Sequence, residues 1–197
     1  LAQKAVESGC KIVTSVAEDV LKKDNVFETK LQNGDIIYSR LAIGSFGKNS
    51  QLDRTLNRSI TSKNSTYLAV KYHIRADLPE NVIALHNFNR GYCGVSRIEN
   101  GLYNLCYLTE TRNLKNSPDF NQLEENVLYQ NPFLKNIFQQ SAKVFEKPLT
   151  ISKITFDKKE LASNNVLMCG DAAGMIVPLC GNGMAMAIHS AKILSGL

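Results

Sequence analysis

The stretch GDAAGMIVPLCGNGMAMAIHSAKIL, residues 170–194, decides the fold of this chain. The apolar run Val166–Cys169 directly precedes it and predicts a short buried strand. A Gly-Asp pair follows as a tight turn, and apolar residues at helical spacing begin near Gly183. The predicted helix carries one apolar face, made of Met184, Ala187, Ile188 and Ala191.

The spacing G-D-A-A-G-x-x-x-P-x-x-G-x-G in this stretch is typical of a ligand site. Asp171 stands at the carboxyl end of the strand, where α/β proteins bind ligands and where a carboxylate accepts hydrogen bonds from hydroxyl groups. Pro178 stiffens the loop, and Gly181 and Gly183 let the backbone approach a flat or anionic group. The helix start offers free N–H groups and a positive dipole end. The alternative is a structural one: the glycines mark a turn and Asp171 caps it.

Composition limits the classes of function. The 197 residues are 44% hydrophobic and 21% charged, which is typical of a globular protein. The net charge is +5, but Lys22-Lys23 and Lys158-Lys159 are the only basic doublets, so we expect no nucleic-acid partner. No run of about 18 apolar residues occurs, and we therefore expect no transmembrane helix.

The cysteines and histidines indicate neither a disulfide framework nor a metal site. The number of cysteines is odd, no C-x-x-C spacing occurs and no secretory signal precedes them, so we expect a reduced, cytoplasmic protein. Cys169 lies in an apolar strand and is interpreted as a small buried residue. The three histidines lack metal-ligand spacing. The residues are Cys10, Cys93, Cys106, Cys169, Cys180, His73, His86 and His189.

The first sixty residues predict one helix and a three-stranded meander. Residues 1–8 have the pattern of a helix end, with Gly9 as its stop. Strands are expected at 11–21, 26–31 and 36–43, joined by turns at Asp24-Asn25 and Asn33-Gly34. In the loop 42–54, Gly44 and Gly47 favour tight turns, and Ser50 is expected to cap a short helix.

From about Thr61 the pattern predicts an antiparallel sheet of at least four strands. The first expected strand alternates, with Tyr67, Ala69, Lys71 and His73 on one face. Asn100-Gly101 closes a hairpin. A helix capped by Ser117, a second one that begins at Pro132 and a strand at 149–156 follow. The expected strands are 65–76, 81–88, 91–98 and 102–109.

Two domains are therefore expected, one from residues 1–60 and 157–197 and the other from residues 61–156. Leu1 is not a methionine, and the first residues have the pattern of the end of a helix rather than its start. We accordingly expect the sequence to be part of a longer protein.

Three motifs resemble a known family. Residues 170–194 resemble the C-terminal flavin motif of FAD-dependent oxidoreductases with the p-hydroxybenzoate hydroxylase fold, a group that includes geranylgeranyl reductases and related monooxygenases. AIGSFGKNSQLDR, residues 42–54, resembles the middle motif of that family, and GYCGVSRIENGLYNLCYL, residues 91–108, its substrate-domain hairpin. The resemblance extends over the whole chain. It implies a mixed α/β fold: part of an FAD-binding Rossmann-like domain with an inserted antiparallel-sheet substrate domain.

The resemblance also implies a role for individual residues. Gly170 would make the turn, Asp171 would hold a hydroxyl of the FAD ribityl chain, and Pro178 would lie near the flavin ring. The backbone at the helix start would face the pyrimidine edge of the ring, where the helix dipole stabilises negative charge on the reduced flavin. The residues of that backbone are Gly181, Asn182, Gly183 and Met184.

The chain departs from the family pattern in two places. Phe46 stands where the middle motif usually has an aspartate, which weakens an NAD(P)H-linked role for that loop; a structural turn explains it equally well. No G-x-G-x-x-G occurs, so the ADP-binding segment of the family is missing from this sequence. We expect the fragment alone to be inactive.

The leading hypothesis is an FAD-dependent oxidoreductase that acts on an apolar, lipid-like or aromatic small molecule. It is either a reductase of the electron-transfer type or a monooxygenase, with NAD(P)H as one candidate electron donor. No catalytic residue is predicted; His73, His86 and Arg97 are candidate pocket residues. Two alternatives stay open: a cofactor-binding module without redox activity, and a structural or interaction domain derived from such an enzyme. Six aromatic residues are expected either to line an apolar cavity or to belong to the core. They are Tyr67, Tyr72, Phe88, Tyr92, Tyr103 and Tyr107.

Overall fold

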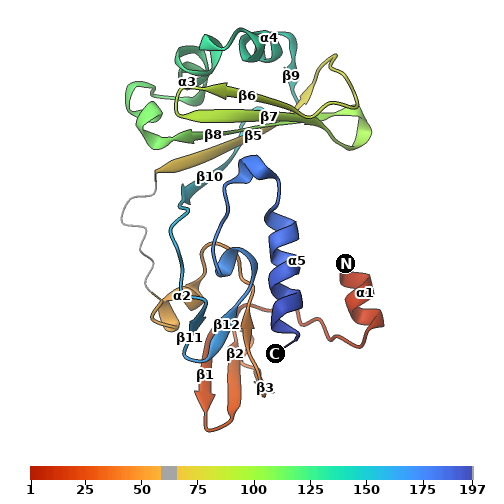
Figure 1. Ribbon diagram of the computed structural model, residues 1–197, viewed down its shortest axis with the longest axis vertical. Helices are drawn as coiled ribbons and strands as arrows, with labels where there is room; N and C mark the ends of the chain where they lie inside the picture. The colour runs from red at the N-terminus through yellow and green to blue at the C-terminus, as the bar shows by residue number, and fades with distance from the viewer. Residues whose placement is uncertain (59–65, 197) are drawn as a thin grey trace. The chain divides into compact units, whose positions relative to one another are not determined.

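A computed structural model describes residues 1–58 and 66–196 (Figure 1). The chain divides into two compact units. The first comprises Leu1–Thr61, Lys158–Ile176 and Asn182–Leu197, and the second comprises Ser62–Asp157 and Val177–Gly181. The predicted domain boundary at residues 60 and 61 lies outside the described residues. No helix in the described part of the chain is long and apolar enough to cross a membrane.

The first unit begins with α1 (Ala2–Glu7), which ends before Gly9 at a φ of +88°. The meander that follows has the strand order β1-β2-β3, and Asp24 and Gly34 adopt the positive φ angles that its two turns require. The strands are β1 (Ala17–Lys23), β2 (Val26–Leu31) and β3 (Ile36–Ser39).

Two of the predicted strand limits in the meander are wrong, because a strand extends only as far as its partner. The predicted strand 11–21 begins at Ala17, since β2 ends at Leu31 and offers no partner to earlier residues. The predicted strand 36–43 ends at Ser39, which pairs with Phe27 near the first turn. Its last residues leave the meander and form β4 (Ile43–Gly44) in another sheet.

That other sheet has the order β11-β12-β4 and carries the predicted strand before residue 170. The strands are β11 (Ala162–Ser163) and β12 (Val166–Met168), and β12 pairs with β4 in parallel. Ser50 caps α2 (Gln51–Thr55) as predicted: the Leu52 N–H donates to its hydroxyl at 3.2 Å, and its own N–H donates to Asp53 at 3.0 Å. The core of the unit consists of Val20, Phe27, Leu52, Leu56, Val166, Met168 and Ala172.

The second unit is an antiparallel sheet with the order β10-β5-β8-β7-β6, and β9 pairs with the end of β5. This confirms and extends the expected sheet of at least four strands. The strands are β5 (Tyr67–Arg75), β6 (Ala84–Phe88), β7 (Gly91–Arg97), β8 (Tyr103–Glu110), β9 (Ala142–Lys143) and β10 (Leu149–Ile154). The sequence Asn100-Gly101 closes the β7–β8 hairpin with φ angles of 60° and 67°.

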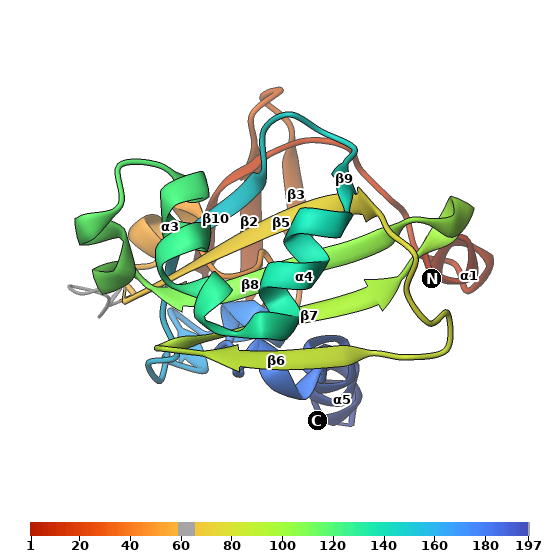
Figure 2. The same ribbon diagram turned by 90° about the horizontal axis from the view of Figure 1, so that it is seen from above.

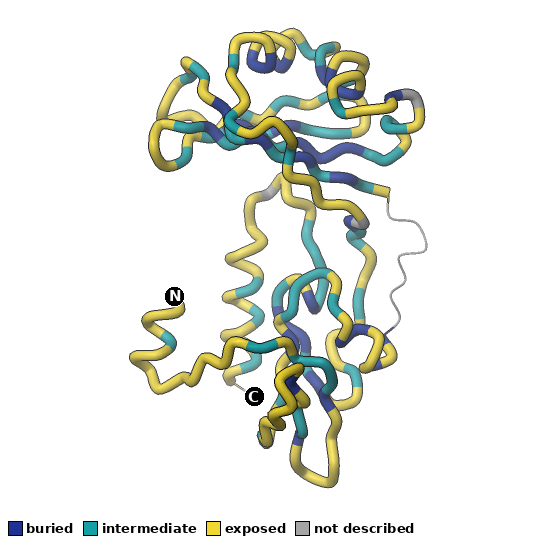
Figure 3. The backbone as a smooth tube through the Cα atoms, turned by 180° about the vertical axis from the view of Figure 1, so that it is seen from behind, coloured by how far each residue is buried: buried dark blue, intermediate teal, exposed yellow. Residues whose placement is uncertain are grey.

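One face of this sheet is covered by α3 (Phe120–Asn126) and α4 (Pro132–Gln140) (Figure 2). The alternation predicted for β5 is confirmed: Leu68, Val70, Tyr72 and Ile74 are buried in the core, and the residues between them are half-buried on the other face. Figure 3 shows the buried strands of this sheet.

The helix limits in the second unit follow from their caps. The predicted cap Ser117 is wrong: Ser117 precedes a proline and stays extended, and Asp119 caps α3 by accepting the Gln122 N–H at 2.8 Å. The second helix, α4, begins at Pro132 as predicted, and the Asn131 side chain caps it. The helix ends at Gln140, because the next residues pair with β5 as β9. Short 3₁₀ turns lie at η1 (Glu99–Gly101), η2 (Thr111–Asn116), η3 (Leu128–Gln130), η4 (Gly170–Ala172) and η5 (Pro178–Cys180).

Candidate functional site

The turn after β12 requires a glycine at its first position. Cys169 is extended and buried, as the sequence predicts, and Gly170 then adopts a φ of +60° at the start of η4. A Cβ on Gly170 would lie 3.3 Å from the Cβ of Ala187 in α5 (Gly183–Leu194). Both the left-handed backbone and the close helix therefore favour glycine here.

Ser190 fastens this turn to α5. Its hydroxyl accepts the Gly170 N–H at 3.1 Å and donates to the carbonyl of Ala187 at 2.8 Å. The Cys169 sulfur lies 3.0 Å from the Ser190 hydroxyl oxygen. One half-buried hydroxyl thus joins the strand end, the turn and the helix.

Two cations hold the carbonyl groups of the turn. The buried Arg58 donates to the Ala172 carbonyl at 2.8 Å and to the Glu160 carbonyl at 2.6 Å, and its charge pairs with Asp53 at 2.6 Å. Lys159 donates to the Asp171 carbonyl at 3.3 Å. Burial is the main cause that lowers the pKa of Lys159. Both cations thus bind backbone carbonyl groups of the turn and not the Asp171 carboxylate.

The Asp171 carboxylate remains available to a ligand. The residue is exposed, and among the described residues its carboxylate makes no hydrogen bond and no ion pair. The structural alternative expected a capping hydrogen bond from the Asp171 side chain, and the described residues contain no such bond. A carboxylate in this position accepts hydrogen bonds from hydroxyl groups.

The start of α5 is open as well. Asn182 is the N-cap, but its side chain makes no capping hydrogen bond, so the first N–H groups of the helix lack a side-chain partner. A Cβ added at Gly183 would meet nothing within 4 Å, and Met184 is 80% exposed. Figure 3 shows that α5 is exposed along almost its whole length, and none of its residues is buried.

The structure brings the strand end and the helix start together at one hollow of about 260 Å³. Of the predicted site residues, Gly170, Asp171 and Gly183 line it, and Asn182 and Met184 flank Gly183 in the chain. The remaining lining residues are Leu161, Ala173, Gly174, Ile176, Met186 and Ser190.

Pro178 and Gly181 belong to the second unit and are not among the residues that line this hollow. They form η5, in which the Gly181 N–H donates to the Pro178 carbonyl at 2.9 Å and Gly181 adopts a φ of +65°. This left-handed conformation favours glycine.

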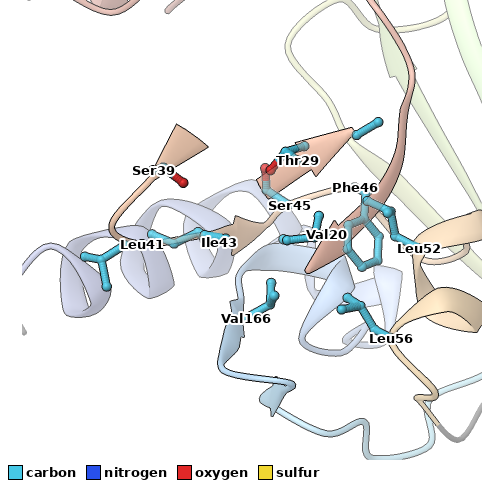
Figure 4. Close-up of a pocket in the computed structure, with 13 residues that line it drawn as sticks. Val20, Thr29, Ser39, Leu41, Ile43, Ser45, Phe46, Leu52, Leu56 and Val166 are labelled. Carbon is cyan, nitrogen blue, oxygen red and sulfur yellow. The ribbon is translucent and has the colours of Figure 1, made fainter. Parts of the chain in front are cut away.

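The middle loop of the first unit lines a second hollow, of about 340 Å³ (Figure 4). Phe46, which departs from the family pattern, packs against the core of this unit, and the guanidinium of Arg58 lies 6.0 Å from its ring centroid. The side chain at this position therefore has a packing role. Ser45, Ser39 and Thr29 are the polar residues at this hollow.

The structure does not bring the three candidate pocket residues of the second unit together. His73 lies on the face of the sheet that the helices leave uncovered, and His86 lies against Phe133 of α4 on the other face. Arg97 pairs with Glu80. Among the aromatic candidates, Tyr72 and Tyr107 are buried core residues, and both donate to the buried Glu124.

The sequence analysis missed Ser190, Arg58, Lys159 and Glu124. Ser190 follows Gly183 by two helical turns, which is a signal for the same helix face. Arg58 and Lys159 act on backbone carbonyls far along the chain, for which the sequence carries no signal. No group of three or more His, Cys, Asp or Glu residues suited to a metal ion occurs among residues 1–58 and 66–196.

Comparison with known proteins defines the fold. No model of a known protein family matches the chain, and no curated protein matches it. Solved structures of a flavoprotein/dehydrogenase and of flavin-dependent halogenating enzymes share its mixed α/β fold, and the predicted fold class is thereby confirmed.

Three of these structures illustrate the likeness. A flavoprotein/dehydrogenase from Cytophaga hutchinsonii is 17% identical with a TM-score of 0.76, over 98% of this chain and 51% of its own. A geranylgeranyl bacteriochlorophyll reductase-like protein from Thermoplasma acidophilum is 21% identical with a TM-score of 0.73, over 95% and 49%. A variant of the halogenase PltM in complex with FAD is 16% identical with a TM-score of 0.72, over 95% and 42%. The chain spans about half the length, or less, of the structures it matches.

Proposed function

We propose that this chain is the flavin-facing part of an FAD-dependent oxidoreductase. The observation that carries the proposal is the hollow at which a free carboxylate, Asp171, and the uncapped start of α5 meet. The shared fold supports FAD as the ligand, since one of the similar structures holds FAD.

The residues at the hollow fit this cofactor. Asp171 accepts a hydrogen bond from a ribityl hydroxyl, and the N–H groups of Gly183 and Met184 donate to the pyrimidine edge of the ring. The open space beside Gly183 admits a flat ring against the backbone. When bound, FAD supplies the redox chemistry. The chain orients it, and the positive end of α5 stabilises negative charge on the ring.

Other parts of the protein complete the proposed enzyme. The ADP half of FAD is held by residues outside this sequence, in keeping with the absent G-x-G-x-x-G and with the share of the similar structures that the chain spans. The second unit binds an apolar or aromatic substrate, and NAD(P)H is the proposed donor. The protein acts in the cytoplasm.

Flavin binding by the full-length protein tests the proposal. We expect a yellow protein, with FAD affinity measured by quenching of flavin fluorescence. Asp171→Asn removes one charge-assisted hydrogen bond and is expected to weaken FAD binding about 10- to 100-fold. The matched control Asp35→Asn changes an exposed turn aspartate of the same unit and is expected to leave the affinity unchanged.

The alternatives give different results. If FAD binds but no donor bleaches the flavin absorbance, the chain belongs to a cofactor-binding module without redox activity. If the full-length protein binds no flavin and Asp171→Asn changes nothing, the proposal fails and a structural domain takes its place.

A further inference from the structure

The chain contains three Asn-Gly sequences, and one of them lies at the start of α5. An asparagine before a glycine readily loses its side-chain amide, because glycine has no side chain to keep its backbone nitrogen away from the asparagine Cγ. In a folded protein the reaction depends on whether these two groups are held by other partners. The three sequences are Asn33-Gly34, Asn100-Gly101 and Asn182-Gly183.

At Asn33-Gly34 both reacting groups are held. The Asn33 side chain donates to the Asp35 carboxylate at 2.7 Å and accepts the Asp35 N–H at 3.2 Å. The Gly34 N–H donates to the Leu31 carbonyl at 3.0 Å. Neither the side-chain amide nor the backbone nitrogen is free, so we expect this site to be protected.

At Asn100-Gly101 the closing hairpin holds the backbone. The Ile98 N–H donates to the Leu102 carbonyl at 2.8 Å, and the Leu102 N–H donates to the Glu99 carbonyl at 3.3 Å. The turn lies between β7 and β8, with Asn100 in the left-handed region at a φ of 60° and a ψ of 26°. Its backbone cannot rotate toward the side chain without breaking the end of the hairpin.

At Asn182-Gly183 both groups are free. Asn182 is exposed, and its side chain makes no hydrogen bond with any residue that the structure describes. The Gly183 N–H is the first of the helix and has no intrahelical partner. A Cβ on Gly183 would meet nothing within 4 Å, so the site has space for a ring to form. The Asn182 carbonyl accepts the Met186 N–H at 2.9 Å, but a bond at a helix end opens readily.

We propose that Asn182 is a site of spontaneous deamidation, and that it reacts faster than Asn33 and Asn100 in the folded protein. The Gly183 nitrogen attacks Cγ of Asn182 and forms a cyclic succinimide. The Cγ–Nδ2 bond breaks, and the side-chain nitrogen leaves as ammonia with the proton of the Gly183 N–H. Water then opens the ring at either carbonyl, which leaves aspartate or isoaspartate. The step needs no oxidant and no reductant.

The product carries a new carboxylate at the start of α5. The positive end of the helix stabilises a negative charge at this position, so we expect α5 to remain folded in the aspartate form. In the isoaspartate form the main chain gains one methylene group, which displaces the N–H groups of Gly183 and Met184. A further consequence rests on the proposed function: the new carboxylate competes with the electron-rich edge of the flavin for the helix start. The deamidation itself does not depend on flavin binding.

Peptide mapping by mass spectrometry tests the proposal on the native protein, incubated free of flavin at mildly alkaline pH. We expect aspartate and isoaspartate to accumulate at Asn182. Asn33 is expected to react at least about tenfold more slowly, because its amide and the Gly34 nitrogen must first leave their partners. In urea the three sites are expected to react at similar rates, which shows that the fold and not the sequence causes the difference.

Gly183→Ala is the variant that tests the route. Its methyl group meets open space, so the fold is kept, but it hinders the attack on Cγ. The variant is expected to slow deamidation of Asn182 at least about tenfold and to leave the rate at Asn33 unchanged. FAD added to the full-length protein is expected to protect Asn182.

The proposal is overturned if Asn182 stays intact in the flavin-free native protein, or if Asn33 or Asn100 reacts as fast. Equal rates at Asn182 in Gly183→Ala and in the native protein would also reject it. Deamidation of Asn182 that FAD does not slow would instead count against flavin at this helix start and would leave the deamidation site in place.

Discussion

The hydroxyl of Ser190 accepts the backbone N–H of Gly170 at 3.1 Å, and this bond joins the middle of α5 to the turn that presents Asp171. The same hydroxyl donates to the Ala187 carbonyl and lies near the Cys169 sulfur. The Ser190 hydroxyl therefore links the helix to the turn of the candidate flavin site.

Ser190→Ala is expected to destabilise the first unit by about 1–2 kcal/mol, because the Gly170 N–H loses its partner. Urea unfolding followed by circular dichroism measures the change. Ser195→Ala is the matched control: its hydroxyl also bonds the carbonyl three residues earlier, but at an exposed position. A loss in the control as large as that in Ser190→Ala would contradict the role given to the Gly170 contact.

Arg58→Met is expected to cost about 3–5 kcal/mol, because it leaves the Asp53 carboxylate buried without its cation. Denaturant unfolding measures the loss, and Arg54→Met, which removes an exposed arginine of α2, is the control. The double variant Asp53→Leu/Arg58→Met is expected to recover part of the loss, since no unpaired charge remains. A double variant that is less stable than Arg58→Met would speak against unpaired charge as the cause.

Glycine substitutions separate ligand contact from folding. Gly183→Ala is expected to leave stability unchanged or raise it by up to about 1 kcal/mol, because the added methyl group meets open space in a helix. The same change is expected to weaken FAD binding to the full-length protein at least about tenfold, a figure that corresponds to about 1.4 kcal/mol. Gly170→Ala, at a φ of +60° and next to Ala187, is expected to lower both stability and affinity. Unchanged FAD affinity in Gly183→Ala would argue against flavin at this helix start.

Alkaline pH is expected to destabilise the second unit. Burial, aided by the Glu124 carboxylate, raises the pKa of Tyr72 and Tyr107 well above the ordinary value of 10.0. Above pH 10 the unfolded chain loses these protons while the folded chain keeps them, so the free energy of unfolding falls as the pH rises. The slope is about 1.4 kcal/mol per pH unit for each tyrosine.

Phenolate absorbance during an alkaline titration measures this effect. Tyr72 and Tyr107 are expected to ionise only as the unit unfolds, and Tyr107→Phe is expected to reduce the slope by about 1.4 kcal/mol per pH unit. Tyr38→Phe, at a 63% exposed position, is the control and is expected to leave the slope unchanged. Early ionisation of all the tyrosines would show that the cluster is open to water.

The local features of the fold were predictable because each depends on neighbouring residues. Gly9, Asp24, Gly34 and Asn100 make the turns expected of them. The cap at Ser50 forms and α4 begins at Pro132, as the sequence predicts. The alternation in β5 likewise identifies its buried face. The cap at Ser117 fails, because the proline after it keeps the residue extended.

The sequence by itself determined the mixed α/β fold class, the strand–turn–helix at residues 166–194 and the residues that favour a ligand there. Only the tertiary structure decided that Ile43–Gly44 leaves the meander to pair with β12, and that residues 142 and 143 end a helix to pair with β5. It also decided which side chains support the turn, since Arg58, Lys159 and Ser190 reach backbone groups that folding brings to them. The backbone conformation at a turn or cap is set by side chains a few residues away. The pairing partner of a strand is instead the distant segment whose backbone N–H and C=O groups bond to those of the strand.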